Sequence, residues 1–135
     1  MKNIITTGSP NWQDRTKVKD VLFELKNRFG IDIRVITLGS KLGADLYIKN
    51  YSMDLGIKYA EYPTFNQPWT ADCVEEEFMY GKPFDKRHLF MRNARLVKLA
   101  ELAVVFYIPT DEFNRPINDL ITQLEKKNKK VMIIQ

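Results

Sequence analysis

The fold is decided by the stretch Leu102-Ala103-Val104-Val105-Phe106-Tyr107-Ile108, which is the most continuous apolar run in the chain. Apolar residues at every position, rather than at alternate positions, indicate a strand that is buried on both faces. Strands of this kind occur in parallel sheets that helices cover on both sides. We therefore expect the run 102–108 to be a central strand of an α/β domain.

Helix-like and strand-like segments alternate on both sides of this run. After it, apolar spacing predicts a helix at Ile117–Lys127 and a strand at Val131–Ile134, and before it a helix at Leu89–Leu99. Further upstream, the expected elements are strands at Ile4–Thr7, Ile31–Leu38 and Lys58–Tyr62, and helices at Asp14–Phe29 and Gly43–Leu55. This alternation predicts an α/β three-layer sandwich with a mostly parallel five-stranded sheet and helices on both faces.

The chain length of 135 residues suits one domain, which we place at residues 1–135. Residues 64–87 interrupt the alternation with an irregular insertion, hereafter the 64–87 segment. It contains Pro68 and Pro83 and is rich in aromatic residues, and a short helix at Cys73–Tyr80 fits within it. A long loop in a compact domain usually covers something, so we expect a lid, a ligand wall or a partner surface.

Composition limits the expected location of the protein and the kinds of ligand that it binds. No apolar run is long enough to span a membrane, and Met1–Ile5 lacks the features of a signal peptide, so a cytoplasmic location is expected. The single Cys73 and the single His88 do not make a zinc site, and no metal or resident cofactor is expected. The net charge of +4 suits an anionic ligand as well as a polynucleotide. The run Lys126–Lys130 falls where a helix should end and complements its dipole.

Ligands of open parallel sheets bind beyond the carboxyl ends of the strands, so the residues after each strand are the candidates. After the first strand, Gly8 permits a tight turn or close approach of a ligand, and Ser9 offers a hydroxyl and an amide. Trp12 either stacks on a base or packs into the core. This corner therefore contributes Gly8, Ser9 and Trp12 as candidate ligand-binding residues.

The corner after the second strand is a turn bracketed by two glycines at the start of a helix. Such a turn directs amide donors at one point, where the helix dipole adds positive potential. The turn is not a Walker A loop, because it lacks the Gly-Lys-Ser/Thr ending. Its candidate ligand-binding residues are Gly39, Ser40, Lys41, Gly43, Ala44 and Asp45, of which Asp45 either favours the dipole, orients the loop or binds a ribose.

The third candidate element is Arg92-Asn93, in the helix that leads into the apolar run. The arginine presents a planar fork suited to phosphate, and the asparagine offers both a donor and an acceptor. A surface salt bridge is the alternative role for Arg92. The nearby Arg87, Arg95 and Lys98 are alternative cations.

Together these motifs resemble the SLOG superfamily of Rossmann-like domains, which includes DprA and the lysine-decarboxylase-like LOG proteins. The likeness is strongest to its small single-domain members in bacteria and phages, and it covers nearly the whole chain. It is carried by Gly8-Ser9 with Trp12, Gly39-x-x-x-Gly43-Ala44-Asp45, Pro63 with Trp69, and Arg92-Asn93 before Ala103–Phe106. The resemblance implies a Rossmann-like sheet that binds nucleotides or nucleotide-derived ligands, in a homodimer or higher homo-oligomer.

Two departures from that pattern limit what the resemblance implies. Pro10 stands where small members carry an arginine, which removes a cation and a backbone donor. After the apolar run, Pro109–Pro116 contains no glycine, whereas the family has a glycine-rich phosphate-binding turn there. Pro109 and Thr110 remain candidate ligand-binding residues, but the N-glycosidic catalysis of the LOG enzymes is not carried over.

The sequence therefore predicts a protein that binds a nucleotide or nucleotide-derived small ligand as a sensor, carrier or sequestering protein. A first alternative is a hydrolase of N-glycosidic or phosphate bonds, with Asp45, Asp111 or Glu112 as the acid/base candidates. A second alternative is DprA-like binding of single-stranded nucleic acid, with Trp12 or Trp69 as a stacking platform.

Overall fold

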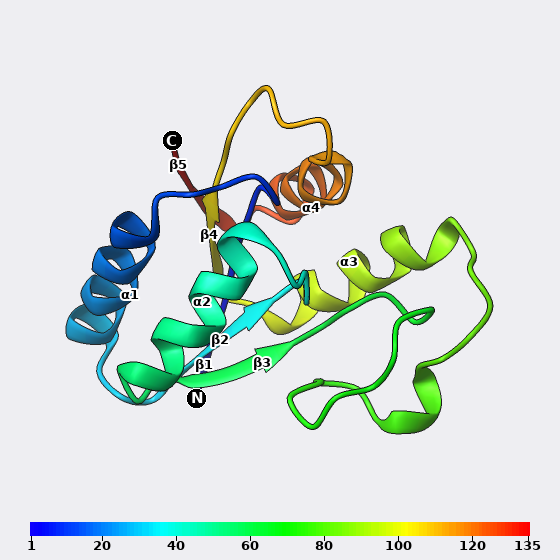
Figure 1. Cartoon of the computed structure of the whole chain (residues 1–135), viewed down its shortest axis with the longest axis horizontal. Coiled ribbons are helices and arrows are strands. Elements are labelled where there is room, and N and C mark those ends of the chain that lie inside the picture. The colour runs from blue at the N-terminus through cyan, green and yellow to red at the C-terminus, as the bar shows by residue number, and fades with distance from the viewer.

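Five strands form one sheet in which every neighbouring pair is parallel (Figure 1). The structure is a computed structural model and describes all residues from 1 to 135. The strands are β1 (Lys2–Gly8), β2 (Ile33–Thr37), β3 (Lys58–Glu61), β4 (Leu102–Phe106) and β5 (Lys130–Ile134), in the order β3-β2-β1-β4-β5. The predicted five-stranded α/β sandwich is confirmed, and its sheet is wholly rather than mostly parallel.

The apolar run forms the strand β4, which lies between β1 and β5. Its side chains alternate between two cores: Val105 packs on one face of the sheet, and Val104 and Phe106 pack on the other. All three are fully buried. The strand ends at Phe106, and Ile108 already belongs to the corner that follows. The prediction of a strand buried on both faces is confirmed.

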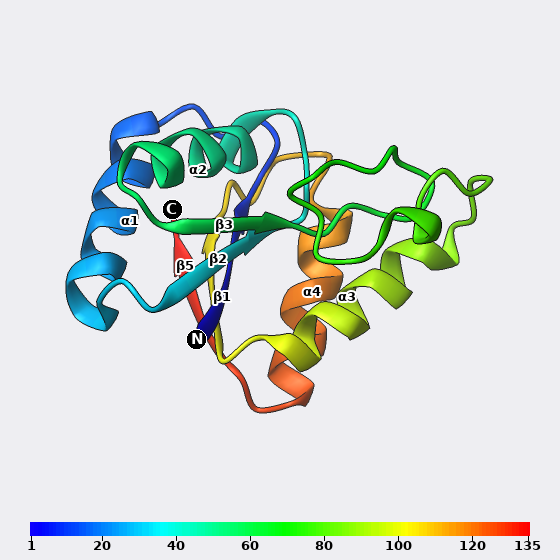
Figure 2. The same ribbon diagram turned by 90° about the horizontal axis from the view of Figure 1, so that it is seen from below.

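The helices cover the two faces of the sheet in pairs (Figure 2). They are α1 (Arg15–Phe29), α2 (Gly43–Asp54), α3 (Arg87–Leu99) and α4 (Arg115–Lys126). Leu22 of α1 and Ile48 of α2 pack in the core on one face, and Leu96 of α3 and Leu120 of α4 in the core on the other. All four are fully buried, and each such side chain contributes about 1.5–3 kcal/mol to folding.

The 64–87 segment is held against α3 and the end of β3. Cys73 forms an isolated parallel bridge with Glu61, and Val74 donates its amide to the Glu61 carbonyl at 3.0 Å. Residues that pair with a strand in this way do not take helical angles. The predicted helix at Cys73–Tyr80 is therefore reduced to a single 3-10 turn, η1 (Glu77–Met79).

Two aromatic side chains of the same segment anchor it to the core on the α3 and α4 face of the sheet. Phe65 and Tyr80 are buried, with their ring centroids 5.7 Å apart, and both belong to the core beneath α3 and α4. At its edge, Glu75 accepts a hydrogen bond from Arg95 of α3 at 2.9 Å. The segment is thus packed over the end of the sheet.

None of the helices is both long enough and apolar enough to cross a lipid bilayer.

Candidate functional site

A cavity of about 770 Å³ opens at the carboxyl ends of β1, β2 and β3. Its walls are the corners after these strands, the 64–87 segment, and the first turns of α3 and α4. Cavities of 300–1,000 Å³ at this edge of an α/β sheet are typical of small-molecule sites. We take this cavity as the candidate functional site.

The structure brings some of the predicted site residues to the cavity and leaves others outside it. The candidates that line it are Gly8, Gly39, Ser40, Lys41, Asp45, Arg92 and Glu112. The candidates that do not line it are Ser9, Trp12, Gly43, Ala44, Asn93, Pro109, Thr110 and Asp111. Four residues of the second group, Ser9, Gly43, Ala44 and Asp111, help to build the corners around the cavity.

Ser9 closes the crevice between the corners after β1 and β4. Its hydroxyl donates to Asn114 Oδ1 at 2.7 Å and accepts the amide of Ile108 at 2.9 Å. Ser9 and Asn114 are both buried, so the chain's own side chains fill this crevice. Pro109 and Thr110 lie on the exposed side of it, away from the cavity.

Asp111 shapes the corner after β4. Its carboxylate accepts the backbone amides of Asn11 and Phe113, each at 2.9 Å. These bonds tie the corners after β1 and β4 together and turn the chain, so that Glu112 and Phe113 line the cavity. Asp111 is therefore a positioning residue for the corner, whereas Glu112 is the acidic candidate that faces the cavity.

Trp12 belongs to the core. It is 5% exposed, and its ring centroid lies 5.4 Å from that of Phe106. Its indole Nε1 donates to the carbonyl oxygen of Asp14 at 2.9 Å. A side chain enclosed in this way cannot serve as a stacking platform for a base, and of the two roles considered for Trp12 the structure has the core one.

Gly43 and Ala44 start α2 where it packs tightly on the corner after β1. Gly43 has a φ of +62°, and a Cβ there would lie 2.2 Å from the carbonyl oxygen of Pro10. A Cβ on Gly8 would lie 2.6 Å from Cβ of Ala44. The two glycines therefore allow close packing between two corners of the sheet.

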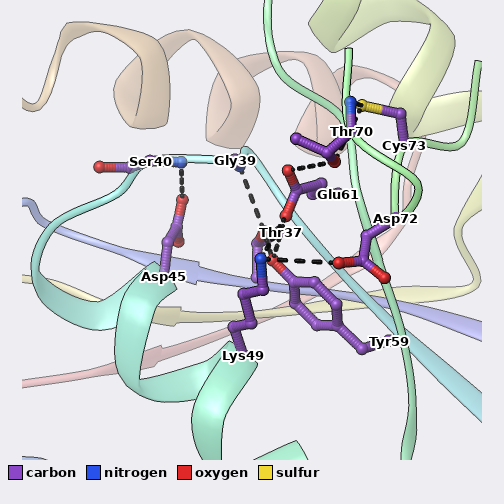
Figure 3. Close-up of polar contacts among 10 residues, drawn as sticks. All are labelled: Thr37, Gly39, Ser40, Asp45, Lys49, Tyr59, Glu61, Thr70, Asp72 and Cys73. Atoms are coloured by element: carbon purple, nitrogen blue, oxygen red, sulfur yellow. Dashed lines mark hydrogen bonds and ion pairs between the residues drawn. The ribbon is translucent and has the colours of Figure 1, made fainter. Parts of the chain in front are cut away.

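Asp45 is buried at the cavity wall, at the start of α2. Its Oδ1 accepts the hydroxyl of Thr7 at 2.6 Å, and its Oδ2 accepts the amide of Ser40 at 3.0 Å (Figure 3 shows the second bond). Burial raises the pKa of the carboxyl to about 6, although these bonds and the charge of Arg92 oppose the shift. Near neutral pH a fraction of the Asp45 side chains therefore carries a proton.

This raised pKa predicts a pH dependence of stability. The folded protein keeps the Asp45 proton up to about pH 6, whereas the unfolded chain loses it near pH 3.8. The free energy of unfolding should therefore fall by about 2 kcal/mol as pH rises from 4 to 7, and Asp45→Asn should lack this component. Urea unfolding of both proteins at each pH unit measures it. A difference between wild type and variant that does not change with pH contradicts the assignment.

Arg92 is the buried cation of the site. It is 3% exposed, and its Nη1 donates to the carbonyl oxygens of Leu38 at 3.2 Å and Tyr62 at 2.9 Å. Its Nε donates to Asn93 Oδ1 at 2.7 Å, and its Nη2 has no partner in the chain. Burial lowers the pKa of the guanidinium to about 10, which leaves it charged at neutral pH.

Asn93 is fully buried and acts through Arg92. Its Nδ2 donates to the carbonyl oxygen of Pro116 at 2.9 Å and to Asp119 Oδ2 at 3.0 Å, while its Oδ1 accepts from Arg92. The side chain thus fixes the guanidinium relative to the start of α4. Asn93 is a positioning residue and does not line the cavity.

The charges of the cavity wall are not balanced by ion pairs. Four cationic side chains line it, Lys41, Lys86, Arg92 and Arg115, and four acidic ones, Asp45, Glu61, Asp85 and Glu112. Asp85 pairs with Arg87 at 2.7 Å, and Glu61 lies 3.7 Å from Nζ of Lys49. None of the four cations has a carboxylate oxygen within 4 Å. The uncompensated charge of the cavity is therefore mainly positive.

Glu61 is a site residue that the sequence analysis missed. It ends β3, is 7% exposed and lines the cavity. Figure 3 shows it among polar side chains from β2, α2, β3 and the 64–87 segment. The available signal was a carboxylate near the carboxyl end of a predicted strand, where parallel sheets place their ligand-binding residues.

Three exposed phenylalanine rings, also missed, line the cavity. Phe84 is 78% exposed, Phe113 57% and Phe90 39%. The guanidinium carbon of Arg115 lies 5.7 Å from the ring centroid of Phe90. Rings left open to solvent around a cavity offer flat apolar faces to a planar ligand.

No protein family model and no curated protein sequence matches this chain. Its structure is similar to that of the molybdenum cofactor binding protein from the phototrophic bacterium Rippkaea orientalis, with a TM-score of 0.63 and 14% identity over 98% of this chain and 75% of that chain. A universal stress protein from Archaeoglobus fulgidus matches with a TM-score of 0.48 and 16% identity, over 100% of this chain and 94% of that chain. At 14% identity, the likeness to the Rippkaea orientalis protein shows a Rossmann-like α/β fold.

Proposed function

We propose that the cavity binds a small nucleotide-like ligand that carries phosphate, and that the protein acts as a sensor, carrier or sequestering protein. The observation that carries the proposal is Arg92, a buried guanidinium at the cavity wall with no carboxylate partner. Burying a charge without an ion-pair partner costs several kcal/mol by order of magnitude, and the three hydrogen bonds of Arg92 go to neutral oxygens. An anionic ligand on the free Nη2 would offset that cost through a charge-assisted hydrogen bond.

The rest of the cavity suits the other parts of such a ligand. Lys41 and Lys86 add exposed positive charge, and Phe84, Phe90 and Phe113 offer faces on which a base can stack. The Rippkaea orientalis protein of similar fold is described as one that binds the molybdenum cofactor, which supports a role of this fold in holding a small ligand. The SLOG resemblance of the sequence points to the same class of ligand.

Calorimetry against a panel of phosphorylated ligands tests the proposal. The panel contains nucleoside mono-, di- and triphosphates, dinucleotides, cyclic nucleotides, ADP-ribose and inorganic phosphate. We expect at least one nucleotide to bind, with an affinity that falls as salt rises, because the exposed lysines are screened. A panel in which no compound releases heat or shifts the melting temperature contradicts the proposal.

Lys41→Ala should weaken the binding of that nucleotide by about 1–2 kcal/mol, because an exposed charge-assisted contact is lost. Lys126→Ala is the matched control, since this lysine lies in the last turn of α4 and does not line the cavity. Calorimetry at low salt measures both variants. Equal affinities of the two variants would place the anion elsewhere in the cavity.

A second candidate function is hydrolysis of an N-glycosidic or phosphate bond. Asp45, with its pKa raised to about 6, shares the cavity with the carboxylate of Glu61. Two carboxyl groups in different environments are a common arrangement for general acid and base. Incubation of the panel at high protein concentration, followed by chromatography, tests this function. Unchanged substrates with the wild-type protein exclude it for those substrates.

A further inference from the structure

Glu61 has a position in the cavity that phosphate binding does not explain. It lines the same wall as the cations, yet its own negative charge repels phosphate. Two hydroxyl groups hold its side chain: Oε1 accepts from Tyr59 at 3.0 Å, and Oε2 accepts from Thr70 at 2.9 Å. Phosphate binding alone therefore gives no role to this ordered carboxylate in the cavity.

A series of hydrogen bonds determines which hydroxyl group donates its proton to Glu61. The amide of Gly39 donates to Thr37 Oγ1 at 3.2 Å, and the hydroxyls of Thr37 and Tyr59 are 2.9 Å apart. Since Tyr59 donates to the carboxylate, it accepts from Thr37. Burial raises the pKa of the Tyr59 hydroxyl, so it keeps this proton. Figure 3 shows this series of hydrogen bonds, which runs from the corner after β2 to Glu61 at the end of β3.

The bonds around Glu61 leave acceptor positions free on its carboxylate. Lys49 Nζ lies 3.7 Å from Oε1 and 3.5 Å from Asp72 Oδ2, which adds positive charge beside the carboxylate. An ionised carboxylate has about four acceptor positions and donates no hydrogen bond. Tyr59 and Thr70 fill one position on each oxygen, so one position on each oxygen remains. The group is therefore ready to accept from two neutral donors on the ligand.

We propose that Glu61 binds the hydroxyl groups of a pentose, so that the cavity takes ribonucleotides in preference to their deoxy counterparts. This inference rests on the proposed nucleotide-binding function. Two adjacent hydroxyls supply two donors on one side of a ring, which matches the two free positions of the carboxylate. The independent indication of a ligand in the same cavity is Arg92, which is 3% exposed and lines the cavity, and whose Nη2 makes no hydrogen bond within the chain. Arg92 then takes the phosphate and Glu61 the sugar.

The test compares the affinities of the ribonucleoside 5′-monophosphates with those of their 2′-deoxy and 3′-deoxy counterparts by calorimetry. We expect the wild-type protein to bind a ribonucleotide at least tenfold more tightly than one of its deoxy counterparts. A deoxy ligand lacks one hydroxyl, so an oxygen of the Glu61 carboxylate is left without a hydrogen bond. Glu61→Gln keeps the size of the side chain and removes its charge. This variant should reduce the preference to threefold or less.

Asp72→Asn is the matched control, because it removes a carboxylate from the same lysine but does not line the cavity. It should keep the preference within twofold of wild type. Equal affinities of ribo- and deoxynucleotides for wild type, or a preference that survives in Glu61→Gln, overturn the inference and leave the proposed function standing. Binding of no nucleotide at all overturns both. Because the comparison of ligands uses the wild-type protein, it holds even if Glu61→Gln fails to fold.

Discussion

Replacing Arg92 with methionine should abolish measurable nucleotide binding and lower the free energy of unfolding by about 2–4 kcal/mol. Methionine fills much of the same space but donates no hydrogen bond. The carbonyl oxygens of Leu38 and Tyr62 then lose their donor in a closed environment, and each such loss costs about 1–3 kcal/mol. Removal of the buried charge offsets part of that cost, because its burial opposes folding.

Two further variants separate the contributions of Arg92. Arg92→Lys keeps the charge but not the planar fork, so binding should weaken at least tenfold without being lost. Arg95→Met is the matched control, because Arg95 is one turn further along α3 and pairs with Glu75 on the surface. It should bind nucleotides like wild type and lose less than about 1 kcal/mol of stability. Calorimetry and urea unfolding measure all three; wild-type affinity in Arg92→Met would contradict the assigned anion site.

Replacing Gly43 with alanine should destabilise the protein by about 3 kcal/mol or more. The new Cβ would lie 2.2 Å from the carbonyl oxygen of Pro10 and 2.8 Å from that of Ser9, both of which are backbone atoms. These atoms move only if the corner after β1 moves. The φ of +62° adds about 1–2 kcal/mol for any residue with a side chain. Since the two corners bound the cavity, ligand binding should weaken as well.

Gly56→Ala is the control for the backbone angle alone. Gly56 also has a positive φ, of +69°, but a Cβ there meets no atom within 4 Å. This variant should cost only about 1–2 kcal/mol and leave ligand binding unchanged. Urea unfolding of both variants gives the comparison. Equal losses of stability would show that the corners after β1 and β2 can separate easily, contrary to the close packing described above.

The fold was predictable because its signals are local. The apolar run at Leu102–Ile108 and the regular change between helix and strand spacing already imply a parallel sheet with two helical layers. The exception was the helix expected at Cys73–Tyr80. Cys73 forms a β-bridge with Glu61 instead, and no pattern in the local sequence predicts a bridge to a residue twelve positions away.

The site was predictable only in part, because the sequence shows which corner a residue belongs to but not which way its side chain points. Asp45, Lys41 and Arg92 line the cavity. Ser9 and Asp111 instead join the corners after β1 and β4 through bonds to residues about one hundred positions away. Such partners become visible only when the strands are placed side by side.

The wall formed by the 64–87 segment and its neighbours shows the same limit. Its irregular spacing predicted a cover of some kind but not which side chains it turns inward. Phe84 and Thr70 face the cavity, whereas Phe65 and Tyr80 are buried in the core. Two phenylalanines of the same segment, Phe84 and Phe65, thus have different roles, and packing against the ends of the strands decides between them.

The most direct test of the central claim is a crystal structure of the protein with the nucleotide that binds most tightly in calorimetry. The account predicts a phosphate oxygen within hydrogen-bond distance of Arg92 Nη2, with the ligand inside the cavity between the end of β2 and the starts of α3 and α4. A nucleotide bound outside this cavity, or with its phosphate turned away from Arg92, would contradict the account.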